Sequence, residues 1–221
     1  MKTDFDAIVL GLGGLGSAAA YWLSKRLGGG VLGLEQFELG HERGSSQDHS
    51  RIIRYSYHAP DYVELAKQAY DAWMAVEAES GRQLVVKTGG LDLFPPGCAN
   101  DIADYRGSLD AGRIDYELLE ADEVRARWPQ FRIDDATRAL FQADGGLVRA
   151  AIANEIHRRL AIEHGASLLD GTPVSTIHAA AGEMVVETPA ATYRCQHLVI
   201  TGGAWTRQRV AQFDRQLPLT V

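Results

Sequence analysis

Three glycines near the N-terminus have the spacing Gly11-x-Gly13-x-x-Gly16. They follow a short apolar run, residues 5–10, and precede a segment rich in alanine and leucine, residues 17–27, an order that predicts a strand, a turn and a helix. Glycine permits the tight turn and lets the backbone approach a pyrophosphate, while the start of the helix offers free N–H groups and the positive end of its dipole. The pattern therefore predicts a binding site for the phosphates of a dinucleotide.

A carboxylate stands where the ribose of such a ligand is expected. Glu35 ends the next apolar run, residues 31–34, about 20 residues after the last glycine of the motif. A carboxylate at this position accepts a hydrogen bond from a ribose hydroxyl. Gly14 and Gln36, which adjoin the motif and the carboxylate, are included in the predicted site. ADP binding is the prediction, and a glycine-rich turn in an unrelated α/β protein is the alternative.

A second glycine turn lies near the end of the chain. The apolar segment 197–201 runs into Thr201-Gly202-Gly203-Ala204-Trp205. NAD and FAD present the same AMP-pyrophosphate half, but many flavoproteins return to the dinucleotide-binding domain with such a strand and turn, so the second turn favours FAD. An ordinary strand-to-helix turn is the alternative. The predicted cofactor site is completed by Thr201, Gly202, Trp205 and Val174.

A third segment places cations and aromatic residues together. Polar residues 36–50, which read as a site loop, lead into Arg51-Ile52-Ile53-Arg54 and then Tyr55-Ser56-Tyr57. Arginine presents a planar fork that holds a carboxylate through two hydrogen bonds, and it stays charged in a partly desolvated pocket. The segment predicts a site loop, and the alternative is that both arginines pair with carboxylates at the protein surface.

The stretch from Gly44 to Tyr57 resembles the monomeric sarcosine oxidase family of FAD-dependent amine oxidases. Members of that family carry a Gly-Ser start, then Ser/Thr-Arg-Ile-Ile-Arg, then a tyrosine. Similar residues also occur here at Glu35, at Thr88-Gly89-Gly90 and at Gly202-Ala204-Trp205. The resemblance covers the whole chain.

The resemblance implies roles for individual residues. Arg54 is implied to pair with the carboxylate of the substrate, Arg51 to lie beside the flavin ring, and Tyr57 to line the substrate site. A fixed positive charge at Arg51 favours the reduced, anionic flavin ring. Ser45 and Ser50 are implied to contact the cofactor.

The activity implied is oxidation of a secondary amine, such as an N-methyl or cyclic imino amino acid, to an imine. FAD is the expected cofactor, an amino-acid-like molecule and dioxygen are the substrates, and hydrogen peroxide is a product. Two alternatives are an NAD(P)-dependent dehydrogenase and a truncated nucleotide-binding fragment without turnover. The family is longer than this chain, so we expect a fragment that lacks the C-terminal half.

These residues require an α/β framework to position them. Residues 5–34 predict a β-α-β unit, residues 61–80 and 148–160 predict amphipathic helices, and two short strands at 84–86 and 91–94 predict a hairpin. The predicted fold is a doubly wound, Rossmann-like FAD-binding domain with an inserted α+β substrate domain. We expect residues 1–82 and 145–221 in the first domain, and 83–144 at the start of the second.

Composition excludes several classes of protein. The chain has 221 residues, 46% of them hydrophobic, with a net charge of −7 and two cysteines. An acidic balance without basic runs argues against nucleic acid, and two distant cysteines predict neither a disulfide framework nor a metal site. The uncharged stretch 7–23 contains four glycines, which favours a buried strand and helix over a signal peptide. We expect a cytoplasmic protein that contacts no membrane and is monomeric at full length.

Overall fold

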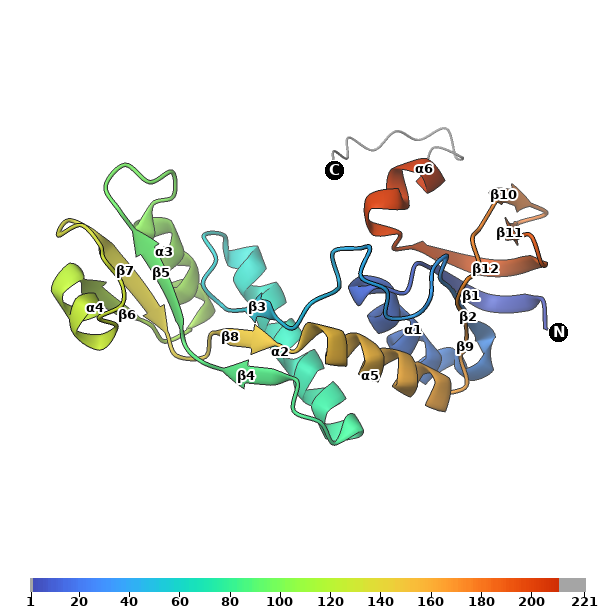
Figure 1. Ribbon diagram of the computed structural model, residues 1–221, viewed down its shortest axis with the longest axis horizontal. Coiled ribbons are helices and arrows are strands. Elements are labelled where there is room, and N and C mark those ends of the chain that lie inside the picture. The colour runs from blue at the N-terminus through green and yellow to red at the C-terminus, as the bar shows by residue number, and fades with distance from the viewer. Residues whose placement is uncertain (1, 211–221) are drawn as a thin grey trace. The chain divides into compact units, whose positions relative to one another are not determined.

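The computed structural model describes residues 2–210 of the chain, which forms two compact units (Figure 1). The first unit comprises Met1–His49 and Ala150–Val221, and the second comprises Ser50–Arg149. The first boundary differs from the predicted one at residue 82. The long helix α2, Pro60–Ser80, belongs to the second unit, where its Val63 packs against Tyr105 and Leu109. An amphipathic pattern shows that a helix has a buried face, but it does not show which core the face covers.

The first unit is built on a six-stranded sheet with the order β10-β11-β12-β1-β2-β9. Strands β12, β1, β2 and β9 are parallel, and β10 and β11 extend this sheet as antiparallel strands. The predicted α/β class with a parallel sheet is confirmed. The strand bounds are β1 Asp4–Leu10, β2 Val31–Leu34, β9 Ser167–Leu169, β10 Thr176–Ala180, β11 Glu183–Glu187 and β12 Thr192–Ile200.

Helices cover the central strands, which explains their continuous apolar sequences. All four residues of β2 are buried, as expected for a parallel strand covered on both faces. Helix α1, Gly14–Leu27, packs against α5, Ala150–Glu163, where the rings of Tyr21 and His157 stack with centroids 5.6 Å apart. Burial and the nearby Arg158 charge lower the pKa of His157 to about 4. The remaining helical elements of the unit are η1 Gly28–Gly30, η2 Gly203–Trp205 and α6 Thr206–Val210.

The second unit contains two small antiparallel sheets, ordered β3-β8-β4 and β5-β7-β6. Helix α3 lies against the second of these sheets through Tyr105, whose ring packs edge-on to Phe94 at 5.2 Å. The strand bounds are β3 Arg51–Ile53, β4 Val85–Lys87, β5 Gly90–Phe94, β6 Glu117–Glu120, β7 Arg138–Gln142 and β8 Gly146–Val148, and the two shorter helices are α3 Ile102–Gly112 and α4 Ala121–Arg127.

The predicted hairpin between residues 84–86 and 91–94 is wrong. Both strands exist, but β4 pairs with β8 and β5 pairs with β7. The chain bends at Gly89, which has a φ of +77°, and continues onto the second sheet instead of reversing. A glycine turn between two apolar runs therefore served here as a bend between sheets, because the better partners of both strands come from residues 138–148.

Candidate nucleotide site and carboxylate site

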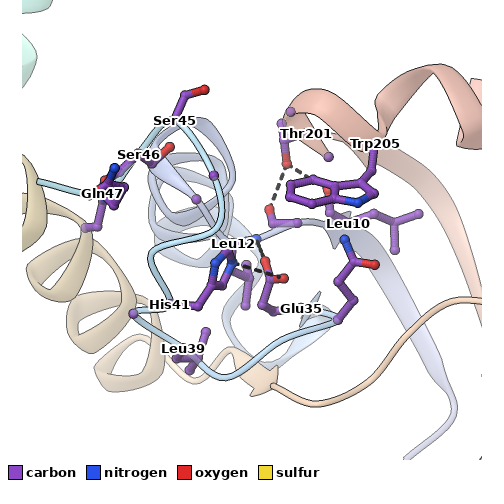
Figure 2. A pocket seen from close by; sticks show the side chains of 18 of the residues that line it. Leu10, Leu12, Glu35, Leu39, His41, Ser45, Ser46, Gln47, Thr201 and Trp205 are labelled. Carbon is purple, nitrogen blue, oxygen red and sulfur yellow. Dashed lines mark hydrogen bonds and ion pairs between the residues drawn. The ribbon is translucent and has the colours of Figure 1, made fainter. Parts of the chain in front are cut away.

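A pocket opens in the first unit where β1, β2 and β12 end (Figure 2). The carboxyl ends of parallel strands are the usual binding edge of an open α/β sheet, because the connecting loops separate there. Predicted cofactor residues that line this pocket are Gly11, Gly13, Glu35, Gln36, Ser45, Val174, Thr201, Gly202 and Trp205.

The first glycine turn brings the backbone to the edge of this pocket. Gly11 has a φ of +90°, and its N–H donates to the Leu34 carbonyl at 2.8 Å. A Cβ on Gly11 would lie 2.8 Å from the carbonyl oxygen of Thr201. A side chain at this position is therefore disfavoured both by the backbone conformation and by the close approach of the second turn. Helix α1 starts immediately after Gly13, which lines the pocket, so the positive end of the helix dipole lies beside the pocket.

Glu35 is held in place by the turn that it faces. Its Oε2 accepts a hydrogen bond from the Leu12 N–H at 2.8 Å, and its Oε1 accepts one from the Phe37 N–H at 3.2 Å. The imidazole of His41 lies 3.5 Å from Oε1 (Figure 2). Glu35 is 5% exposed, and each carboxylate oxygen has a second lone pair. A buried carboxylate oriented in this way is suited to accept hydroxyl hydrogens of a ribose.

The second glycine turn is tied directly to the first. Thr201 Oγ1 donates to the carbonyls of Leu10 and Gly11, at 3.0 and 2.9 Å, and the Thr201 N–H donates to the Leu10 carbonyl at 2.9 Å. Trp205 packs edge-on to Phe37 at 5.4 Å, which closes the pocket between η2 and the loop after β2. Residues far apart in the sequence thus form one rim.

Three further residues of this pocket were missed by the sequence analysis. Ser46 Oγ accepts a hydrogen bond from the Gly14 N–H at 2.8 Å, and Asn154 Nδ2 donates to the Ser46 carbonyl at 2.8 Å. Arg158 also lines the pocket from α5, and burial lowers its pKa. Ser46 was identifiable only as a neighbour of Ser45, and the two α5 residues had no motif to reveal them.

The structure places the other predicted cofactor residues outside this rim. Gly14 begins α1 and Gly16 lies within it, so both belong to the helix that follows the turn and do not line the pocket. Ser50 and Arg51 belong to the second unit, where Arg51 starts β3 and its Nη1 donates to the Ser50 carbonyl at 2.7 Å. Their contacts with a cofactor remain predictions.

The second unit holds a compact cluster around Arg54. Its Nη1 lies 2.7 Å from Asp92 Oδ1, and its guanidinium carbon lies 5.1 Å from the centroid of the Tyr57 ring. Ser56 Oγ donates to Asp92 Oδ2 at 2.6 Å. The alternative considered from the sequence, an ion pair with a protein carboxylate, therefore occurs at Arg54. The pair is only partly exposed, with 33% of the Arg54 side chain and 21% of the Asp92 side chain accessible. Binding of a substrate carboxylate by Arg54 remains a prediction.

Fold and pocket together define an α/β protein with a pocket at the carboxyl ends of its parallel strands, the edge at which such sheets bind dinucleotides. The sequence profile of the FAD dependent oxidoreductase (DAO) family matches residues 6–221, and the chain belongs to this family. The predicted cofactor, FAD, is confirmed at this level, and the resemblance stated from the sequence is confirmed as well.

Curated relatives extend the comparison. The chain is 37% identical over 225 aligned residues to a protein named monomeric sarcosine oxidase from Streptomyces avermitilis. This match covers all of the present chain and 57% of the relative. The chain is 31% identical to the monomeric sarcosine oxidase of Arthrobacter sp. (99% and 56% covered) and 30% identical to the N-methyl-L-tryptophan oxidase of Salmonella heidelberg (96% and 57%). The chain thus spans little more than half the length of these relatives.

Solved structures share the fold. NikD, described as an unusual amino acid oxidase essential for nikkomycin biosynthesis, superposes with a TM-score of 0.85 at 24% identity, covering 95% of this chain and 54% of that one. Glycine oxidase from Geobacillus kaustophilus superposes with a TM-score of 0.82 at 21% identity, covering 98% and 60%. Within residues 2–210, no helix combines the length and the apolar character that crossing a bilayer demands.

Proposed function

We propose that this chain supplies the FAD site and part of the substrate site of an amine oxidase acting on secondary or N-methylated amino acids. The observation that carries the proposal is the pocket in which the glycine turn, Glu35 and the Thr201 turn meet, in a chain of the FAD dependent oxidoreductase family. The names of the relatives, monomeric sarcosine oxidase and N-methyl-L-tryptophan oxidase, support the class of substrate.

The residues of the pocket have the chemistry that FAD requires. The turn at Gly11 and Gly13 lets the backbone approach the pyrophosphate closely and directs the N-terminus of a 14-residue helix toward it. Glu35 accepts from the ribose, and Gln36, Ser45 and Thr201 offer further polar contacts along the rim. Ser46 and Asn154 brace the glycine turn from the opposite side.

Residues of the second unit act on the substrate in this proposal. Arg54 binds the carboxylate and so fixes the carbon next to the amine nitrogen, and Tyr57 limits the space beside it. Arg51 provides a fixed positive charge near the reacting ring. FAD held in the pocket of the first unit would supply the redox chemistry, a two-electron oxidation of the amine coupled to reduction of dioxygen to hydrogen peroxide. The imine product is hydrolysed by water.

An absorbance spectrum of the purified protein from the near ultraviolet to the visible tests this proposal. We expect flavin absorption bands, either as purified or after addition of FAD, and release or retention of colour on acid precipitation distinguishes non-covalent from covalent flavin. With N-methyl amino acids under air, the bound flavin should bleach and hydrogen peroxide should accumulate. A protein that ignores FAD but binds NAD(P) contradicts the proposal, and flavin binding without bleaching by any amino acid contradicts its substrate class.

A further inference from the structure

Asp92, which the sequence analysis did not single out, holds the guanidinium of Arg54. Arg54 Nη1 donates to Asp92 Oδ1 at 2.7 Å, and Ser56 Oγ donates to Asp92 Oδ2 at 2.6 Å. Ser56 is 1% exposed, so the hydroxyl that holds Asp92 is itself fixed by its surroundings. Asp92 therefore presents one oxygen to Arg54 from a defined position at the centre of β5.

The guanidinium keeps most of its hydrogen-bond donors. It has five N–H donors, and the contact with Asp92 uses one nitrogen, Nη1. Throughout residues 2–210, the structure gives Arg54 no second hydrogen bond or ion pair, and its guanidinium also lies over the Tyr57 ring. A carboxylate oxygen bound at one nitrogen leaves donors for a second carboxylate, because a guanidinium can be approached along more than one edge.

We propose that Asp92 is a positioning residue, which together with Ser56 sets the orientation of Arg54 for the carboxylate of an amino-acid substrate. This inference rests on the proposed function, in which Arg54 is the partner of that carboxylate. A free arginine side chain has many rotamers, which it loses when it binds a ligand. The contacts with Asp92 and Tyr57 restrict Arg54 before the ligand arrives, so less conformational freedom is lost on binding.

A competing role for Asp92 predicts the opposite change in carboxylate affinity when the charge of Asp92 is removed. If Asp92 only occupied Arg54 and had to be displaced, removing its charge would strengthen the binding of carboxylates. As a positioning residue, Asp92 instead improves binding, and removing its charge weakens it. The monodentate contact and the buried Ser56 anchor favour positioning, because Asp92 is itself held and most of the guanidinium is left open.

Calorimetric titration of the FAD-loaded protein with trimethylacetate distinguishes these roles. This carboxylate has no hydrogen on its α-carbon, so it cannot be oxidised there, and trimethylacetamide is its uncharged counterpart. We expect Asp92→Asn to weaken carboxylate binding about tenfold and to change amide binding less than twofold. The matched control is Glu117→Gln, which removes another ion pair of the same unit, Glu117 Oε2 to Arg127 Nη2, also 2.7 Å long. The control should bind trimethylacetate as the wild type does.

Arg54→Gln separates a failure of this inference from a failure of the proposed function. If Arg54→Gln leaves carboxylate affinity unchanged, the proposed role of Arg54 is wrong. If it weakens binding while Asp92→Asn binds as tightly as the wild type or more tightly, only the role of Asp92 is wrong. Asp92→Asn added to Arg54→Gln should cause no further loss, and a further loss would reveal a general structural effect and overturn the inference. Ser56→Ala should weaken binding about threefold, and it replaces Asp92→Asn in the test if that variant does not fold.

Discussion

The two units build their candidate sites from different parts of the polypeptide. In the first unit, the rim of the pocket is largely backbone, with Gly11 forced into a positive φ and Thr201 hydrogen-bonded to two carbonyls of the neighbouring turn. In the second unit, the site is a cluster of side chains, with Arg54, Asp92 and Ser56 joined across β5 and the segment after β3. The backbone turns of the first site can be damaged only by changing the fold locally, whereas contacts made by side chains, such as those of Glu35 or Arg54, can be altered one at a time. Substitutions in the two units should therefore have different consequences.

Gly11→Ala should have the largest effect. The substitution combines a φ of +90° with a contact of 2.8 Å to the Thr201 carbonyl, so we expect a loss of about 3 kcal/mol in stability and a reduction of FAD affinity on the order of 100-fold. Thermal unfolding and FAD titration measure the two quantities. The matched control is Gly182→Ala, because Gly182 has a φ of +84° and nothing within 4 Å of the added Cβ. It should lose about 1 kcal/mol of stability with unchanged FAD affinity, and equal FAD losses in both variants would contradict the close-approach argument.

Arg54→Gln should affect the other site and leave the first intact. Loss of a charged hydrogen-bond partner costs about 2 kcal/mol, which corresponds to a roughly 30-fold higher Kd for carboxylate ligands. FAD content, measured by absorbance after gel filtration, should equal that of the wild type. Loss of flavin in this variant would show that a substitution at the carboxylate site also disturbs FAD binding, contrary to the comparison of the two sites.

Glu35→Gln should lower FAD affinity about tenfold, because the charged acceptor for the ribose is lost while Oε contacts with the Leu12 and Phe37 N–H groups can partly persist. FAD titration monitored by flavin fluorescence measures the change. The control is Glu38→Gln, which removes the same charge from an exposed residue of the same loop. If the two variants lose equal affinity, the effect is general electrostatics and the ribose contact is wrong.

The last test concerns the core of the first unit, outside both candidate sites, and uses pH. The pKa of His157 is about 4 in the folded protein, below its ordinary value of 6.5, so the unfolded chain binds this proton first as the pH falls. Stability from this group is therefore complete above about pH 6.5 and is lost between pH 6.5 and 4, with about 2 kcal/mol lost by pH 5. Denaturant unfolding of the wild type and of His157→Gln between pH 7 and 5 measures the difference. Parallel pH dependence of both proteins would show that His157 is not the responsible group.

Local sequence was sufficient to predict that the glycine turn and Glu35 meet at the edge of the sheet, because these residues are close together in the chain. Glycine at positions 11 and 13, an apolar strand before it and Glu35 after the next strand lie within one β-α-β unit, where the order of elements and the handedness of the crossover fix the geometry. The apolar segment ending at Thr201 was recognisable by the same reasoning. Its parallel pairing with β1 was not predicted from the sequence and is found in the folded sheet.

The side chains that meet around Arg54 were not predictable from the sequence, because they come together only in the folded protein. Asp92 lies in a different strand, and neither its type nor its spacing from Arg54 distinguishes it from the other carboxylates of an acidic chain. The same reason explains why the predicted hairpin at residues 84–94 is wrong. Strands β4 and β5 pair with strands in residues 138–148, and no local sequence pattern indicates those partners. Helices, strands and glycine turns were predictable from the sequence, because their geometry depends on neighbouring residues. The pairing of strands and the partners of charged side chains depend on tertiary packing. Several partners distant in the sequence have similar local energies, and only the packing of the whole unit selects among them.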